Sequence, residues 1–186
     1  MSNRKGRLFI ISAPSGTGKS TVINHMIAKR DDIVLSISAT TRKPREGEID
    51  GKSYYFVTRE EFAAMIDRGE FLEHAEYIGE FYGTPKKPIY DCISKGKVAL
   101  LEIEIQGARQ VMEKEPDAVS IFIAPPDMGE LERRLRGRGT DTEEKLAARL
   151  VRAAHELEEK DNYAHIVVND SVERAVAEIL AIIDNA

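Results

Sequence analysis

The chain has 186 residues, 42% of them hydrophobic and 32% charged, which is ordinary for a globular domain that buries its core without disulfides. Its net charge of −5 disfavours nucleic-acid partners, and it shows neither a secretory leader nor an apolar run of about 18 residues that could cross a membrane. The single cysteine, Cys92, excludes an internal disulfide, so we expect a cytoplasmic protein in a reducing compartment.

The first predicted element is a buried strand at Leu8–Ile11, and the apolar residues after the following glycine-rich loop recur at the spacing of a helix. Further apolar runs predict core strands at Val98–Leu101, Val119–Ile123 and Ile166–Val168, with a closing helix after the last of them. Apolar strands that alternate with helices are typical of a parallel sheet covered on both faces. We therefore expect an α/β fold with a three-layer, parallel-sheet core.

Two stretches interrupt this pattern and predict insertions. From about residue 36 to 95, short and partly polar strands at Tyr54–Val57 and Phe71–Tyr77 flank a helical segment at Arg59–Arg68, which predicts a small mixed α/β insertion. From about residue 131 to 157, we expect a helix that begins at a capping box formed by Thr140 and Glu143. The core of this single unit then comprises about residues 1–35, 96–130 and 158–186.

The strongest local signal is a glycine-rich run between the first strand and the first helix, which is the context of a phosphate-binding P-loop. Backbone N–H groups of such a loop surround phosphate oxygens, and the helix N-terminus adds positive potential. Lys19 would reach the β- and γ-phosphates of a nucleoside triphosphate, and Ser20 would bind Mg²⁺. Ala13 stands at the first glycine position of the pattern and fits there if its φ is negative. The run is Ala13-Pro14-Ser15-Gly16-Thr17-Gly18-Lys19-Ser20.

A local basic cluster indicates a second phosphate site. Arg42 and Arg45 stand three residues apart around Pro44, against the acidic balance of the chain. Planar guanidinium groups bind phosphate oxygens through two parallel hydrogen bonds. A charged run is usually a solvated face, but a cluster of the minority sign is harder to explain in that way.

These motifs and several later ones resemble those of bacterial-type guanylate kinases, a family of nucleoside-monophosphate kinases. They follow in the family's order over nearly the whole chain, from about Arg7 to the last helix, and the arginine-containing segment is the most specific of them. The matching segments are the P-loop, Ser36–Glu48, Gly51–Tyr54, Phe71–Glu73, Tyr82–Thr84, Gln106–Ala108 (expected to be a turn), the lid segment Arg138–Glu144, and Arg149 with Leu150.

The resemblance implies a P-loop core with a GMP-binding insertion and a lid, which transfers the γ-phosphoryl group of Mg-ATP to GMP with Mg²⁺ as cofactor. It implies that Lys19, Arg138 and Arg149 are catalytic and that Ser20 and Glu102 hold the metal ion. The whole P-loop would bind ATP, with Asn169 beside adenine; an N-cap in a plain turn before the last helix is an equal alternative for Asn169. The residues implied to bind GMP are Ser38, Arg42, Arg45, Tyr54, Glu73, Tyr82, Thr84 and Glu104.

The chemistry of the base supports the assignment of Glu73. Guanine presents hydrogen-bond donors at N1 and at its exocyclic amine, which a carboxylate accepts, whereas adenine presents a lone pair at N1. A buried carboxylate would remain unpaired against adenine, and a site rejects a near-isostere in this way. Glu104 departs from the usual family pattern, because many relatives carry an aspartate there, and its arm is therefore longer.

Two other functions stay open from the sequence. A guanylate-kinase-like scaffold module that binds phosphopeptides usually loses the P-loop lysine or the lid arginines, whereas this chain keeps Lys19, Arg138 and Arg149. A P-loop kinase for a different phosphorylated acceptor is disfavoured by the base-pocket residues, above all Glu73 and Thr84. The expected partners are ATP and GMP, without nucleic acid or membrane, and monomer and homodimer are both left open.

Overall fold

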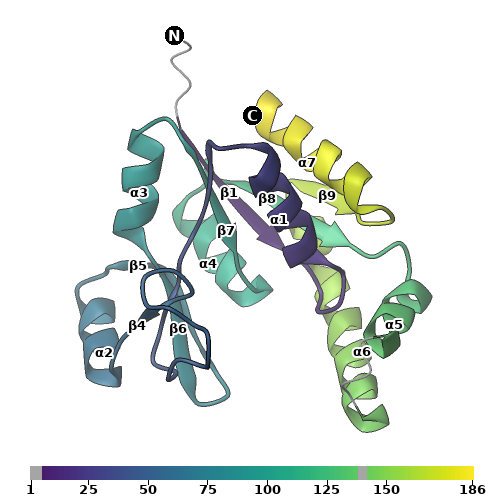
Figure 1. Ribbon diagram of the computed structural model, residues 1–186, viewed down its shortest axis with the longest axis horizontal. Helices are drawn as coiled ribbons and strands as arrows, with labels where there is room; N and C mark the ends of the chain where they lie inside the picture. Colours follow the sequence, from purple (N-terminus) through teal and green to yellow (C-terminus); the bar gives the residue numbers. More distant parts are fainter. Residues whose placement is uncertain (1–5, 138–141) are drawn as a thin grey trace. The chain divides into compact units, whose positions relative to one another are not determined.

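The computed structural model describes residues 6–137 and 142–186 (Figure 1). The chain forms two compact units. The first contains Asp32–Leu101 and Gln106–Ala118 with the start of the chain up to Leu8, and the second contains Phe9–Asp31, Glu102–Ile105 and Val119–Ala186. Among the described residues, every helix is too short or too polar to span a lipid bilayer.

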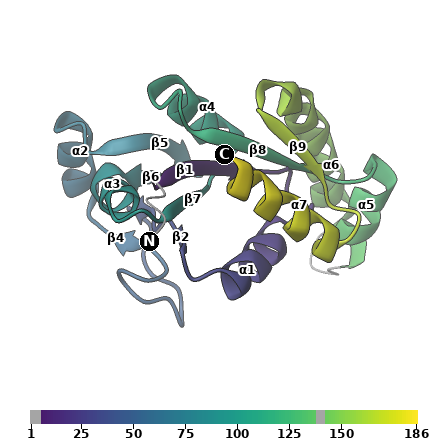
Figure 2. The ribbon, with the colours of Figure 1, turned by 90° about the horizontal axis from the view of Figure 1, so that it is seen from above.

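The second unit is built on parallel strands. Its central strand β8 pairs in parallel with β1 on one side and with β9 on the other. Figure 2 shows α1 and α7 side by side on one face of these strands, with α6 on the opposite side. The elements are β1 (Arg7–Ser12), α1 (Lys19–Lys29), β8 (Val119–Ala124), α5 (Met128–Gly137), α6 (Glu143–Glu158), the 3-10 helix η1 (Glu159–Asn162), β9 (His165–Val168) and α7 (Val172–Asn185).

The apolar pattern of this unit explains its layers. The run Leu8–Ile11 of β1 is buried throughout, because side chains on both faces of a covered sheet leave water. Helix α7 turns Ala175, Val176, Ile179 and Ile183 inward, at the spacing of one helical face, and leaves its other residues at or near the surface. The predicted strands and the closing helix are therefore present where the sequence placed them.

Helices α5 and α6 form a smaller apolar cluster of their own. Leu131 and Leu135 of α5 pack with Leu146 and Ala153 of α6, and Leu150 lies against them. The N-cap of α6 is Thr142, whose hydroxyl accepts a hydrogen bond from the backbone N–H of Lys145. The predicted capping box was therefore wrong: the helix starts two residues later than a Thr140 cap would require, and its N3 position holds a lysine rather than a glutamate. Thr140 itself lies outside the described residues.

The first unit contains a separate four-stranded sheet in the order β4-β3-β6-β5. Strand β3 pairs in parallel with β4, and β6 pairs antiparallel with both β3 and β5. In the same unit β2 and β7 pair in parallel. The elements are β2 (Ile33–Leu35), β3 (Ala39–Thr40), β4 (Tyr55–Phe56), α2 (Arg59–Asp67), β5 (Phe71–Tyr77), β6 (Glu80–Pro85), α3 (Lys86–Ser94), β7 (Val98–Glu102) and α4 (Ile105–Lys114).

Helix α2 is fixed to this small sheet by aromatic packing. The ring of Phe62 stacks on Phe71 of β5 at a centroid distance of 4.5 Å and on Phe81 of β6 at 5.5 Å. Thr58 caps the helix by accepting a hydrogen bond from the N–H of Glu61. The mixed α/β character predicted for this stretch is thus observed.

The larger sheet has the strand order β2-β7-β1-β8-β9. The strand pairs described above for this sheet are all parallel, and helices accompany them, which confirms the predicted α/β fold class.

Candidate phosphate and nucleotide sites

The glycine-rich loop between β1 and α1 is shaped to receive an anion. Gly16 and Gly18 have φ values of 95° and 94°, in the region that favours glycine. Gly18 is also the N-cap of α1; it offers no capping side chain, and the first helical turn contains no acidic residue. Backbone N–H groups at this helix end are therefore left for a ligand. Ile78 is the only described non-glycine residue with positive φ. The φ of Ala13 is therefore negative, as an alanine at the first glycine position of the motif requires.

The two glycines also let neighbouring groups approach the loop closely. A Cβ atom at Gly16 would lie 2.5 Å from Cδ2 of Leu135 on α5, and one at Gly18 would lie 2.8 Å from Nδ2 of Asn169. These contacts are too short for any side chain. The loop is thus packed against helix α5 and the end of β9, which fixes its backbone before any phosphate arrives.

Lys19 and Ser20 both contact the carboxylate of Glu102, which lies far from them in the sequence. The Ser20 hydroxyl donates a hydrogen bond of 2.7 Å to Oε1 of Glu102, and Nζ of Lys19 lies 3.7 Å from the same oxygen. Burial lowers the pKa of Lys19, while the negative charges of Glu102, Glu104 and Glu156 act in the opposite direction. A largely buried cation close to several carboxylates marks this loop as a site of unusual electrostatics.

Ser20 and Glu102 suit a magnesium ion that arrives with a nucleotide. Both supply hard oxygen donors, and Mg²⁺ usually takes only one or two protein carboxylates and completes its shell with phosphates and water. In residues 6–137 and 142–186 there is no group of three or more histidine, cysteine, aspartate or glutamate side chains that could hold a metal ion by itself.

Of the two arginines predicted for the lid, Arg149 lies in the described part of the chain and Arg138 does not. Arg149 of α6 donates a hydrogen bond of 2.6 Å to the hydroxyl of Ser15 in the P-loop. Arg138 lies outside the described residues. Arg134, to which the sequence assigned no role, donates to the carbonyl oxygens of Thr17 at 3.1 Å and Asn169 at 2.9 Å. This arginine ties α5 to both the P-loop and the end of β9.

Asn169 is a buried residue with one unpartnered side-chain oxygen, and it does not cap a helix. It is 2% exposed, and its Nδ2 donates to the carbonyl oxygen of Thr17 at 2.7 Å. Its Oδ1 is buried and has no hydrogen-bond partner. The cap of α7 is Ser171, which accepts a hydrogen bond from the N–H of Arg174, so the N-cap alternative for Asn169 was wrong. An orphan buried acceptor is costly unless a donor, such as an exocyclic amine, reaches it.

In the first unit, Arg42 is held between a carboxylate and two tyrosines. Its Nη1 and Nη2 donate to Oε2 and Oε1 of Glu48 at 2.9 and 2.8 Å, and its guanidinium lies over the ring of Tyr54 at 5.4 Å. The rings of Tyr54 and Tyr82 meet edge to face at 6.1 Å. The hydrogen bond to Glu48, and to a lesser degree one to Tyr82, raises the pKa of Arg42 above its ordinary value. Arg42, Tyr54 and Tyr82 are thus brought together.

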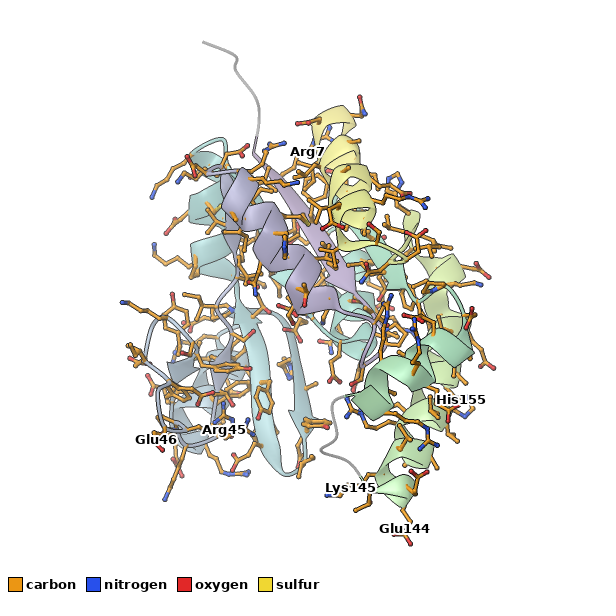
Figure 3. All side chains as sticks on the ribbon, turned by 45° about the vertical axis from the view of Figure 1, so that its right-hand side comes forward. Arg7, Arg45, Glu46, Glu144, Lys145 and His155 are labelled. Carbon is orange, nitrogen blue, oxygen red and sulfur yellow. The ribbon has the colours of Figure 1, made fainter. Side chains whose placement is uncertain are left out.

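Glu48 is the residue of this site to which the sequence assigned no role. Its Oε2 also accepts a hydrogen bond of 2.7 Å from the backbone N–H of Arg45, and these contacts lower the pKa of Glu48 to about 2, the bond from Arg42 contributing most. The side chain of Arg45 is exposed, and Figure 3 shows Arg45 and Glu46 at the outer end of the loop. Glu48 is the last residue of the most specific motif, Ser36–Glu48, and this position was the available sequence signal for its role.

Glu73 and Thr84 form a buried polar pair on the facing strands β5 and β6. Glu73 is 6% exposed, and the Thr84 hydroxyl, which is fully buried, donates to its Oε1 at 2.6 Å. A Cβ atom at Gly107 would lie 2.7 Å from Oε2 of Glu73. The predicted turn at Gln106–Ala108 was wrong, because these residues lie in helix α4; the glycine is needed there for clearance rather than for a turn.

The last two predicted base-pocket residues, Ser38 and Glu104, belong to different units. Ser38 is half-buried just before β3, and its carbonyl oxygen accepts the N–H of Tyr55 at 2.9 Å. Glu104 belongs to the second unit, where it accepts a hydrogen bond of 2.9 Å from Nη2 of Arg152. Arg152 also pairs along its own helix, because its Nε donates to Oε1 of Glu156 at 2.8 Å.

Comparison with known proteins gives one consistent result. The family model described as guanylate kinase matches residues 5–186. A guanylate kinase of Clostridium perfringens is 49% identical over 181 residues, covering 97% of this chain and 84% of the relative. One of Prochlorococcus marinus is 46% identical over 183 residues, covering 98% and 99%. The crystal structure of guanylate kinase from Anaplasma phagocytophilum matches with a TM-score of 0.77 and 40% identity, covering 98% of this chain and 87% of that one.

Proposed function

The chain belongs to the guanylate kinase family, and from this premise we propose that it transfers the γ-phosphoryl group of Mg-ATP to GMP in the cytoplasm, giving ADP and GDP. The observation that carries the choice of acceptor is the buried carboxylate of Glu73. Thr84 donates a hydrogen bond to its Oε1, and because Gly107 has no side chain, Oε2 fits closely against helix α4. A carboxylate held in this way accepts the donors on the edge of guanine and leaves adenine without a partner.

On the donor side, the loop Ala13–Ser20 would bind the phosphates of ATP through its backbone N–H groups, with Lys19 at the γ-phosphate. Ser20 and Glu102 would hold Mg²⁺, which neutralises phosphate charge when it is bound. The exposed donor edge of adenine would satisfy the orphan Oδ1 of Asn169.

On the acceptor side, Arg42, Arg45, Tyr54 and Tyr82 would hold the phosphate of GMP. Glu48 takes the end of the Arg42 guanidinium formed by Nη1 and Nη2, so the adjoining edge, formed by Nε and Nη2, is the one to meet a phosphate. The residues proposed to line the guanine pocket are Ser38, Glu73, Thr84 and Glu104.

Catalysis in this scheme is positioning plus positive charge. A phosphate oxygen of GMP is already anionic and attacks the γ-phosphorus in line, so the protein needs no general base. Charge spreads over the equatorial oxygens of the migrating group, and Lys19, Arg149 and Arg138 would stabilise it there. The lid would comprise about residues 131–157 and the GMP-binding insertion about residues 36–95, and their closure would keep water from the γ-phosphate.

The test is a coupled assay of ADP release with GMP, AMP, CMP and UMP as acceptors. We expect GMP to be strongly preferred, GDP to form in equal amount to ADP, and EDTA to abolish the reaction. Binding of GMP without formation of GDP under any divalent metal would support a scaffold module instead, and equal use of AMP would reject the guanine pocket.

A further inference from the structure

Strand β5 carries Glu73 and stands at the end of the four-stranded sheet of the first unit, so its outer edge meets no further strand of that sheet. An edge strand leaves backbone N–H and C=O groups that need partners from elsewhere. On the inner edge, the register between β5 and β6 shifts between Phe71 and Glu73. The ladder with β6 is therefore irregular next to the residue that carries the carboxylate, and contacts on the outer edge of β5 matter more there.

Two side chains of helix α4, both in the same unit, supply partners for this edge. The amide of Gln110 pairs twice with the backbone of His74: its Oε1 accepts from the N–H at 3.3 Å, and its Nε2 donates to the carbonyl oxygen at 2.9 Å. Nζ of Lys114 donates to the carbonyl oxygen of Leu72 at 2.7 Å. The amide of Gln110 thus takes the place of a neighbouring strand, and the two side chains hold the residues immediately before and after Glu73.

The same face of α4 also receives the carboxylate of Glu73. Gly107, Gln110 and Lys114 follow one another at spacings of three and four residues, which places them along one helical face. Gly107 is buried, and its lack of a side chain lets Oε2 of Glu73 lie close against the helix. One helical face therefore fixes both the backbone on either side of Glu73 and the place of its carboxylate.

We propose that Gln110 is a positioning residue for base recognition: by pairing with the backbone of His74, it sets the direction in which Glu73 presents its carboxylate to the donor edge of a guanine acceptor. The proposal rests on the proposed function, because it takes GMP as the acceptor and Glu73 as the carboxylate that reads the base. The amide of Gln110 is engaged with the backbone, so it acts through Glu73 and not on the substrate. Lys114 acts in the same way from the other side, through Leu72.

The consequence is an effect on the choice of base. A carboxylate distinguishes guanine from adenine only when its oxygens lie in line with the donors, because hydrogen bonds weaken steeply with distance and angle. The readout is therefore the ratio of kcat/KM for GMP to that for AMP, which measures discrimination between the two acceptors. A loss of folded protein or of ATP binding lowers both values alike and cancels in the ratio, so a merely structural role of Gln110 would not change it.

The experiment is a double-mutant cycle in the full-length protein, with GMP and AMP as acceptors. Gln110→Met keeps the length of the side chain and removes both hydrogen bonds to His74. It should lower the ratio about fivefold, because a misaligned charge-assisted hydrogen bond loses part of its strength, and leave the KM for ATP unchanged. In the Glu73→Gln background the same change should lower the ratio less than about twofold, because Gln110 acts through the carboxylate.

Lys114 provides a second variant with its own rescue. Lys114→Met removes the contact with Leu72 on the other side of Glu73 and should lower the ratio about twofold, since it removes one hydrogen bond instead of two. Lys114→Arg keeps a long side chain with hydrogen-bond donors and should retain the ratio of the wild type. If Gln110→Met does not fold, this pair of variants decides the question through the same readout.

Glu113→Met is the matched control. Glu113 is exposed on α4, so the variant places the same methionine on the same helix and should leave the ratio unchanged. A ratio that stays at the wild-type value in Gln110→Met, or that falls equally in the wild type and in the Glu73→Gln background, overturns the proposal. A wild-type protein that forms no GDP from GMP, or that uses AMP equally well, overturns the proposed function instead, and the two failures are therefore distinguishable.

Discussion

The Arg42 site in the first unit and the P-loop in the second each pair a cationic side chain with a carboxylate of the protein. The two carboxylates come from different distances along the chain. Arg42 takes its partner from its own loop, six residues along the chain. Ser20 and Lys19 take Glu102 from a segment about 82 residues away. Burial lowers the pKa of Lys19, whereas the contact with Glu48 raises that of Arg42.

This difference shows how each site prepares for an anion. Arg42 is a permanent charge whose direction is set by a local carboxylate, so the proposed acceptor site is organised by a short stretch of sequence. Lys19 is a buried charge whose desolvation is only partly offset by carboxylates, so an arriving phosphate relieves an electrostatic cost that the fold has created. The first site should therefore act mainly on binding and the second mainly on the chemical step.

Removal of the P-loop cation should have the largest effect. Lys19→Ala should lower kcat by about 10²-fold or more, because the charge acts on the migrating phosphoryl group. Steady-state kinetics with GMP and ATP measures this, with Lys29→Ala at the exposed end of α1 as the control. A loss confined to the KM for ATP would remove the distinction between the two sites.

Removal of the acceptor-site cation comes next. Arg42→Ala should raise the KM for GMP by roughly 10- to 100-fold, the range of a charge-assisted hydrogen bond worth about 1.5–3 kcal/mol, with a smaller loss in kcat from poorer alignment. Lys43→Ala, an exposed neighbour, serves as the control. If Arg42→Ala instead reproduced the kcat profile of Lys19→Ala, the proposed division between binding and chemistry would be wrong.

A change of base preference should follow from the buried pair beside these phosphate sites. Glu73→Gln keeps the shape of the side chain but replaces one acceptor with a donor, so the ratio of kcat/KM for GMP over AMP should fall at least about tenfold, equivalent to about 1.4 kcal/mol. The KM for ATP and the melting temperature must stay near those of the wild type. Full retention of the preference for GMP under these controls contradicts the pocket assignment.

The smallest effect concerns pH. Because its contacts hold the pKa of Glu48 at about 2, below the ordinary value of 4.5, Glu48 stays ionised in the folded protein at neutral and mildly acidic pH. Its contribution to stability is present above the ordinary pKa and is lost as pH falls from about 4.5 towards 2. The difference in unfolding free energy between the wild type and Glu48→Gln should be constant from about pH 5 to 8 and shrink below that range.

Urea denaturation across this pH range measures the difference, and Glu46→Gln in the same loop is the matched control, because Glu46 is an exposed glutamate two residues from Glu48. A difference that grows towards acid pH would mean that Glu48 is destabilised by its surroundings. In that case the acceptor site would resemble the P-loop, and the comparison between the two sites would fail.

Regular elements with strong local patterns could be predicted from the sequence. The strand predicted at Phe71–Tyr77 has those bounds in the structure, because alternating and apolar residues are bounded by glycine on both sides. The Thr142 cap was missed because the sequence offers two threonines two residues apart, and only the path of the chain decides which one precedes the helix. Whether the predicted site residues carry their assigned roles stays a matter for the variants above.

The sequence by itself determined the parts of this protein that depend on neighbours along the chain: the glycine-rich loop between the first strand and the first helix, the Arg42 cluster and the order of strands and helices. Only the tertiary structure decided which distant groups meet. It brought Glu102 within hydrogen-bond distance of Ser20 and Glu104 within hydrogen-bond distance of Arg152, and it packed Glu73 against Gly107. The physical reason is that hydrogen bonds and steric clearance act over a few ångströms in space, and residues many positions apart reach that range only after the apolar core has brought their strands and helices together.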